Sequence, residues 1–206
     1  MNIKVLSEEE FKPSTITIAG SFNISVDIRN IADWIPIKNI FDKDGKRQHL
    51  VSGSRESIKY FGPEGCIVSM CYKKTRRGMR TGAMNNMISA DMQYNHKNIH
   101  LKISSTSITS VGTNSLEDGE KVFNLMTQHI INLKNLLDEI NSIDKEEKIK
   151  SLIWLKENLI DNCQILTQKI KDSKDDINKN FLNFCSLFIE DQDDKEIDLE
   201  KMSQLL

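Results

Sequence analysis

The feature that most constrains this chain is a change of hydrophobic period near Gly112. Before it, short stretches such as residues 14–19 alternate apolar and polar side chains, which is typical of half-buried strands. After it, apolar residues between positions 122 and 140 recur three and four residues apart, which is typical of an amphipathic helix. The pattern therefore predicts a sheet built by the first half and helices built by the second.

The expected elements follow from these patterns and from breakers between them. We expect a strand at 14–19, a helix at 26–35 closed by Pro36, a long exposed loop at 37–63, strands at 66–72, 87–94 and 98–111, a hairpin tip at 73–82, and helices at 116–141, 145–172, 174–190 and 196–206. The predicted fold class is α+β, a curved antiparallel sheet with helices on one face, followed by a mostly helical C-terminal region. The other sheet face would remain open for binding.

Charge is distributed unevenly along the 206 residues. Residues 1–110 carry 16 Lys and Arg against 10 Asp and Glu, whereas residues 111–206 carry 12 against 20. A nucleic-acid surface is therefore expected in the first half. There is no apolar run of about 18 residues, so no membrane association is expected. The acidic stretch Glu8–Glu10 argues against a targeting peptide, and we expect an intracellular protein.

Signals for catalysis and for metal binding are weak. The four cysteines contain no C-x-x-C pair, and we interpret them as reduced, mostly buried thiols. The four histidines are scattered, and the glycine-containing loops lack the phosphate-loop pattern. No carboxylate pair stands beside a nucleophile. We therefore expect no metal, no cofactor and no enzymatic activity.

The densest charge feature is a run of five basic residues with no acid between them. They are Lys73, Lys74, Arg76, Arg77 and Arg80. Such a run can contact phosphates and add affinity that does not depend on DNA sequence. The alternative is a solvated hairpin tip, because charged residues also favour exposed turns.

Two segments carry a family resemblance. Residues 14–35, STITIAGSFNISVDIRNIADWI, and residues 100–115, HLKISSTSITSVGTNS, follow each other in the order and spacing of one TATA-binding-protein repeat. The spacing Asp27-x-x-x-Ile31-Ala32 and a Val-Gly step at Gly112, where the family usually has Thr-Gly, contribute to the likeness. The chain is most similar to the divergent TATA-binding-like proteins of large DNA viruses. The resemblance covers residues 13–135.

The resemblance implies a saddle of two repeats whose concave sheet lies on the minor groove of AT-rich DNA, with Phe side chains wedged between base steps. It implies that six residues of this chain face DNA: Thr15, Thr17, Leu101, Ile103, Thr109 and Val111. Ile103 occupies an intercalating Phe position. The other such position falls near Gly65, which has no side chain to insert, with Phe61 the nearest aromatic residue.

The C-terminal part, residues 136–206, is a helical region and a candidate start of a degenerate second repeat. Residues 26–35 can be laid over residues 197–206 with apolar residues at five of the ten positions. Residues 180–188 are then a candidate counterpart of the first strand. The alternative is chance similarity between two amphipathic helices.

The functional hypothesis is a DNA-binding transcription initiation factor, of viral origin, acting in the nucleus or in a viral factory of the host cytoplasm. Its expected partners are double-stranded DNA, preferably AT-rich, an RNA polymerase or initiation factors, and a second repeat or a second copy. One alternative is a non-catalytic protein-interaction module that retains the repeat fold without DNA binding. Another is an accessory domain of a nucleic-acid enzyme.

Overall fold

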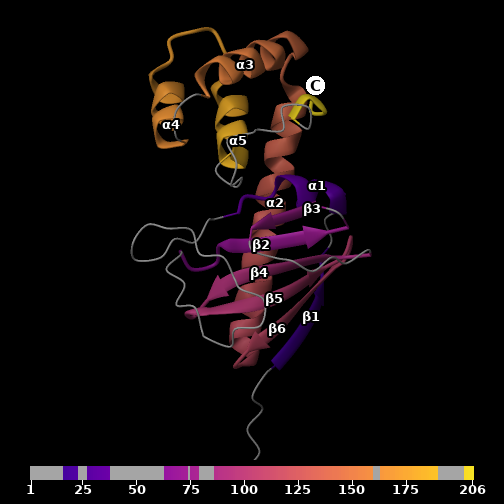
Figure 1. Ribbon diagram of the computed structural model, residues 1–206. Helices are drawn as coiled ribbons and strands as arrows, with labels where there is room; N and C mark the ends of the chain where they lie inside the picture. The colour runs from indigo at the N-terminus through magenta and orange to yellow at the C-terminus, as the bar shows by residue number, and fades with distance from the viewer. Residues whose placement is uncertain are drawn as a thin grey trace, which may run out of the picture.

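A computed structural model describes residues 16–22, 27–37, 63–73, 75–78, 86–159, 163–189 and 202–206 of the chain. Its elements in chain order are β1 (Ile16–Ser21), α1 (Ile28–Trp34), β2 (Ile67–Tyr72), β3 (Thr75–Gly78), β4 (Ile88–Tyr94), β5 (Lys97–Ile103), β6 (Ser107–Thr113), α2 (Leu116–Ser142), α3 (Lys145–Asn158), α4 (Cys163–Asp172) and α5 (Lys179–Ile189) (Figure 1). Thr15, Lys74, Arg80 and residues 38–62 of the loop expected at 37–63 lie outside the described residues.

The strands form an antiparallel sheet in the order β1-β6-β5-β4-β2-β3. The predicted α+β class with an open antiparallel sheet is confirmed. The first strand pairs with the last, so β1 joins the sheet beside β6 rather than beside β2. Strand β3 was not expected as a separate strand. The segment predicted as one hairpin tip contains a tight turn at Lys73, and β3 then pairs with β2 along the sheet edge.

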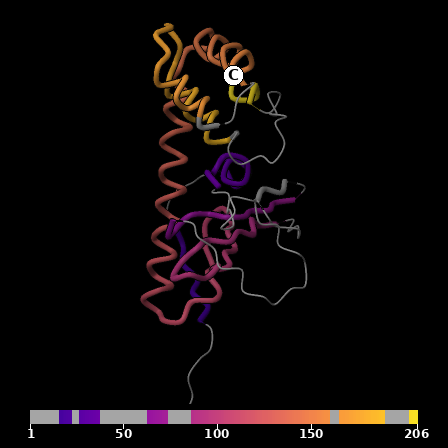
Figure 2. The backbone as a smooth tube through the Cα atoms, turned by 60° about the vertical axis from the view of Figure 1, so that its left-hand side comes forward, coloured from indigo at the N-terminus to yellow at the C-terminus, as the bar shows by residue number. Residues whose placement is uncertain are grey.

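Helices α1 and α2 pack on the same face of the sheet (Figures 1 and 2). Ser115 caps the N-terminus of α2, because its hydroxyl accepts a hydrogen bond from the Asp118 amide at 3.1 Å. The buried residues of α2 pack against β1 and β6. Gly119 of α2 lies directly against Ile18, so the absence of a side chain at this position permits the close approach. The chain thus buries one sheet face under helices and leaves the opposite face free of described helices.

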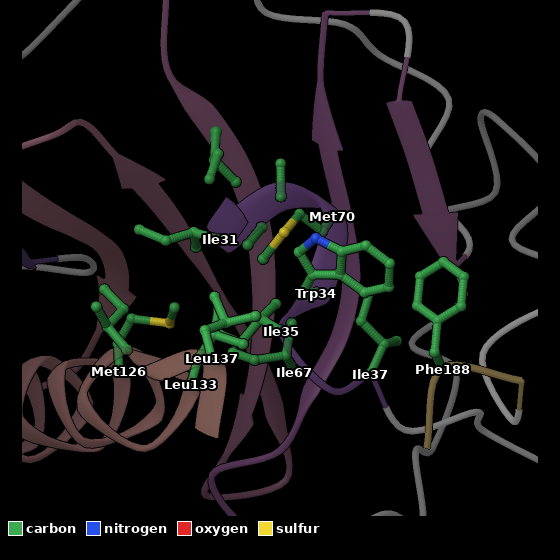
Figure 3. Close-up of a cluster of buried hydrophobic side chains, with 14 of the residues drawn as sticks. Ile31, Trp34, Ile35, Ile37, Ile67, Met70, Met126, Leu133, Leu137 and Phe188 are labelled. Carbon is green, nitrogen blue, oxygen red and sulfur yellow. The ribbon is translucent and has the colours of Figure 1, made fainter. Parts of the chain in front are cut away.

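The core lies between α1, β2 and α2. Figure 3 shows Ile31 and Ile35 of the α1 segment facing Ile67 of β2 and Leu133 of α2. All four side chains are at most 2% exposed. Trp34 continues this core toward the C-terminal helices, because its ring lies 5.3 Å from the ring of Phe184 and 4.9 Å from that of Phe188, both in α5.

Helix α2 extends beyond the sheet and reaches α3, α4 and α5 at its far end (Figure 2). The single helix expected at 145–172 is wrong, because α3 ends at Asn158 and α4 begins at Cys163. The C-cap of α3 is Leu159, and residues 160–162 lie outside the described residues. The helix expected from residue 174 begins instead at Lys179, where the Asn178 side chain accepts from the Phe181 amide at 2.9 Å. Among the described helices, none is both long and apolar enough to cross a bilayer.

Residues 180–188 lie within helix α5. The interpretation of this segment as the first strand of a second repeat is therefore wrong. The physical reason is its apolar spacing: Phe181, Cys185 and Phe188 recur on one helical face and are all at most 4% exposed. Burial raises the pKa of Cys185 to about 12. Residues 197–201 of the internal similarity lie outside the described residues.

Candidate nucleic-acid interface

The strand register sorts the side chains onto two faces. Residues directly opposite each other in antiparallel strands share a face, and neighbours along a strand alternate. Thr17 pairs with Val111, and Thr109 pairs with both Ala19 and Lys102. These residues lie opposite the face on which Ile18 contacts α2. We call this surface the open sheet face, defined by Thr17, Ala19, Ser21, His100, Lys102, Ser107, Thr109 and Val111.

Three of the predicted site residues lie on the open sheet face. Thr17 is exposed, and Thr109 and Val111 are half-buried. Their contact with DNA stays a prediction, but their position makes such contact possible. The alternation of Ile16 and Ile18 with polar neighbours was the signal that identified the face of β1.

Leu101 and Ile103 do not lie on this face, and the expectation that they do is wrong. Both side chains are 0% exposed in the core, where Leu101 pairs with Ser110 and Ile103 with Ile108. The hydrophobic effect decides their orientation, because β5 has apolar side chains on one face and polar ones on the other. His100 and Lys102 occupy the face that had been assigned to Leu101 and Ile103.

The described members of the basic run, Lys73, Arg76 and Arg77, lie at the other edge of the sheet. Lys73 is exposed in the turn with φ 51°, and its ammonium lies 5.1 Å from the centre of the Tyr72 ring. In β3, Arg76 pairs with Cys71 and Arg77 with Met70. Strands β1 and β3 are the two edges of the sheet, which at about 4.8 Å per strand separates them by roughly 24 Å. The structure therefore does not bring these three basic residues together with Thr17.

A hydrogen-bonded polar network crosses β2, β4 and β5 on the same side of the sheet. The Ser69 hydroxyl donates to Asp91 Oδ2 at 2.6 Å, and Asp91 Oδ1 lies 3.2 Å from His100 Nδ1. His100 Nε2 lies 3.3 Å from Ser89 Oγ. Sequence reasoning did not predict this network. Its signal was the polar alternation of Ser89, Asp91 and Gln93 along β4.

Ser89, His100 and Asp91 have the connectivity of a nucleophile, a base and an orienting carboxylate. Two observations argue against such a role. Ser89 is only 2% exposed, so a substrate has little access to its hydroxyl. The strands around Ser89 pair with each other in the ladders β2–β4 and β4–β5, which use backbone amides that an oxyanion hole would need. We interpret the network as one that holds the polar side chains of the sheet in place.

Accessibility changes across this side of the sheet. In β2 and β4, Ser69, Cys71, Ser89 and Gln93 are at most 3% exposed. In β1 and β5, Thr17, Ser21 and Lys102 are exposed. The accessible part is therefore the half formed by β1, β6 and β5, and its side chains are mostly small or hydroxyl-bearing.

Within the described ranges, no group of three or more His, Cys, Asp or Glu side chains could hold a metal ion. His129 Nε2 lies 2.7 Å from the Gly65 carbonyl, and His96 is exposed in the turn between β4 and β5. Cys66, Cys71 and Cys185 are buried free thiols, as the sequence predicted for most of the cysteines.

Comparison with models of known families, with curated proteins and with solved structures finds no match to this chain. These comparisons therefore do not show which family the chain belongs to. The functional argument therefore rests on the residues of the open sheet face and on the order of its elements.

Proposed function

We propose that this protein is a transcription initiation factor resembling TATA-binding protein, and that it binds the minor groove of AT-rich DNA through the open sheet face. The supporting observation is a sheet with its described helices on one face and small, hydroxyl-bearing side chains exposed on the other. The order of strand, helix, antiparallel strands and long helix is the order that the resemblance implies.

The chemistry of the open sheet face suits a minor groove. The groove presents mainly acceptor atoms at A·T pairs, and it is narrow, so short side chains such as Thr17, Ala19 and Thr109 can approach its floor. Their hydroxyls can donate hydrogen bonds to those acceptors. Lys102 is exposed on β5, which lies between β6 and β4. It would contact phosphate and add salt-dependent affinity.

The proposal does not include a sharp bend made by Ile103, because this side chain lies in the core. Among the described members of the open sheet face there is no Phe, Tyr or Trp to wedge between base steps. We therefore propose that this copy holds DNA without intercalation, and that a second copy or a second repeat completes the surface.

The test is equilibrium binding to matched AT-rich and GC-rich duplexes at rising salt. Lys102→Glu should weaken binding about tenfold at low salt, because it replaces an attraction to phosphate by a repulsion. Lys150→Glu is the matched control, since it makes the same charge change on the exposed face of α3. Absence of binding to either duplex at modest salt, or equal losses in the two variants, would contradict the proposal.

The second candidate is a protein-interaction module that retains the fold without DNA contact. The burial of Ser69, Cys71 and Ser89 favours it, because it reduces the accessible polar surface of the sheet. On this alternative, replacing both Arg76 and Arg77 by Glu leaves partner binding unchanged. A loss of duplex binding in the same double variant would contradict this alternative and would show that DNA also contacts the β3 edge of the sheet.

A further inference from the structure

Strand β1 forms one edge of the sheet, and its outer side pairs with no strand in the part of the chain that the structure describes. Alternate residues of an edge strand direct backbone N–H and C=O groups away from the sheet, where another strand can pair with them. The register with β6 shifts between Ile16 and Thr17, so residues 17–21 are the regular part of this edge. The backbone of β1 is therefore a template for one more strand.

The residues of β1 lack the charges and prolines that commonly protect an edge strand. Its sequence, ITIAGS, contains neither. Strand β3, at the opposite edge of the sheet, contains Arg76 and Arg77. Charged residues on an edge strand oppose its pairing with another chain. Of the two edges, β1 is thus the one suited to pairing.

The apolar layer between β1 and α2 is incompletely covered at this edge. Ile18 lies against Gly119, and Phe123 lies against Gly20, yet the side chains of Ile18 and Phe123 are only half-buried. Leu116 precedes Gly119 by one helical turn on the same face of α2 and is 62% exposed. A further strand beside β1 would bury more of this apolar surface, which favours association.

A second copy of the chain fits this edge, because a twofold interface brings a strand against itself. A charged residue near the axis would repel its own symmetry mate, and β1 has none. Residues directly opposite each other in antiparallel strands share a face. Pairing that keeps Ile18 beneath α2 and Thr17 on the open sheet face therefore places Ile18 or Ala19 on the axis. Either register joins the open sheet faces of the two copies edge to edge.

We infer that two copies of this chain pair antiparallel through β1, so that their open sheet faces form one continuous surface. The inference deepens the proposed function, because it names the partner that completes the DNA surface, and its consequence for DNA rests on that function. An edge of six residues is small against the roughly 1,200 Å² that stable interfaces bury. The dimer should therefore be weak without DNA, with a dissociation constant on the order of 10–100 μM, and a duplex that contacts both copies should favour it.

The experiment measures the mass of the full chain by sedimentation equilibrium without DNA, between about 1 and about 500 μM. Ala19 is exposed, so its replacement leaves the core intact. Ala19→Lys and Ala19→Glu each place a charge near its own symmetry mate, and each should raise the dissociation constant of the dimer about tenfold or more. An equimolar mixture of the two variants brings opposite charges together and should restore the dissociation constant to within about threefold of the wild type.

The matched controls are Asn135→Lys and Asn135→Glu. Asn135 is exposed on α2, about 18 Å along the helix from Phe123, and these variants should leave the dissociation constant unchanged, alone or mixed. A chain that stays monomeric at the highest concentration would overturn the inference. A dimer that the Ala19 variants leave intact, or that their mixture does not restore, would also overturn it, because the copies would then associate elsewhere.

Sedimentation with an added AT-rich duplex separates the inference from the proposed function. If the dimer follows the predicted order of variants but binds no duplex at modest salt, the proposed function fails and the inference stands. If the duplex binds single copies of a chain that shows no dimer, the inference fails and the proposed function stands.

Discussion

The two faces of the sheet are built by the same strands and have opposite properties. In β5, Leu101 and Ile103 are 0% exposed beneath the helices, while their neighbours His100 and Lys102 reach the other side. Burying apolar surface supplies the main driving force for folding, so the helix-covered face determines stability. The open sheet face contributes little to it and is free to determine binding. Substitutions on the helix-covered face should therefore change the free energy of unfolding, and substitutions on the open sheet face should change DNA binding.

The largest expected effect is on the helix-covered face. Ile103→Ala should lower the free energy of unfolding by about 2–5 kcal/mol, because it removes buried apolar atoms and leaves a cavity. Thr109→Ala, on the open sheet face, should change it by no more than about 0.5 kcal/mol. Urea denaturation of the two variants measures both values. Similar decreases in unfolding free energy in the two variants would contradict the proposed difference between the two faces.

A smaller effect is expected where α2 meets β1. In Gly119→Ala the added methyl group would overlap the Ile18 side chain, and the resulting strain should cost about 1–2 kcal/mol despite the better helix propensity of alanine. Shortening the partner in Ile18→Val/Gly119→Ala should recover part of this loss. A double-mutant cycle measures the coupling, and strictly additive effects would show that the two positions are not in contact in solution.

The smallest effect concerns Tyr94, whose hydroxyl lies 3.4 Å from Asp118 Oδ1 of α2. Burial, together with the nearby Asp118 and Glu64, raises the pKa of Tyr94, and Lys121 opposes this shift. Because the neutral form is favoured in the folded state, this contribution to stability is present below about pH 10 and is lost as the pH rises further. Tyr94→Phe should be nearly neutral at pH 7 and should show a smaller alkaline decrease in unfolding free energy. If the alkaline decrease in unfolding free energy is the same in the variant and the wild type, groups other than Tyr94 cause it.

The sequence predicted the fold class because its period changes sharply at Gly112, and it predicted the face of β1 because Ile16 and Ile18 alternate with polar residues. The prediction from sequence was wrong where it followed the family resemblance instead of the apolar and polar alternation of the strand. The resemblance assigned Leu101 and Ile103 to DNA, although the alternation of β5 itself places its apolar side chains in the core. Helix boundaries near Asn158 and Lys179 were missed because apolar spacing continues across residues that favour caps and turns.

The network of Ser69, Asp91, His100 and Ser89 could not have been predicted in the same way. Its members come from three strands, and the register that brings Asp91 opposite His100 depends on the tight turn at Asn95 and His96, both with positive φ. The bulge between Ile67 and Ser69 then sets which residue of β2 meets Asp91. The turn falls in the gap between the strands expected at 87–94 and 98–111, but the register that it sets and the bulge in β2 have no distinct signal in the residue pattern.

The most direct test of the central claim is to map the backbone amide shifts of the labelled protein by NMR while an AT-rich duplex is added at modest salt. The account predicts that the largest shifts occur in β1, β5 and β6, at residues such as Thr17, Lys102 and Thr109, with little change in α3 and α5. Absence of shifts, or shifts confined to the helical region, would contradict the assignment of the open sheet face as a DNA-binding surface.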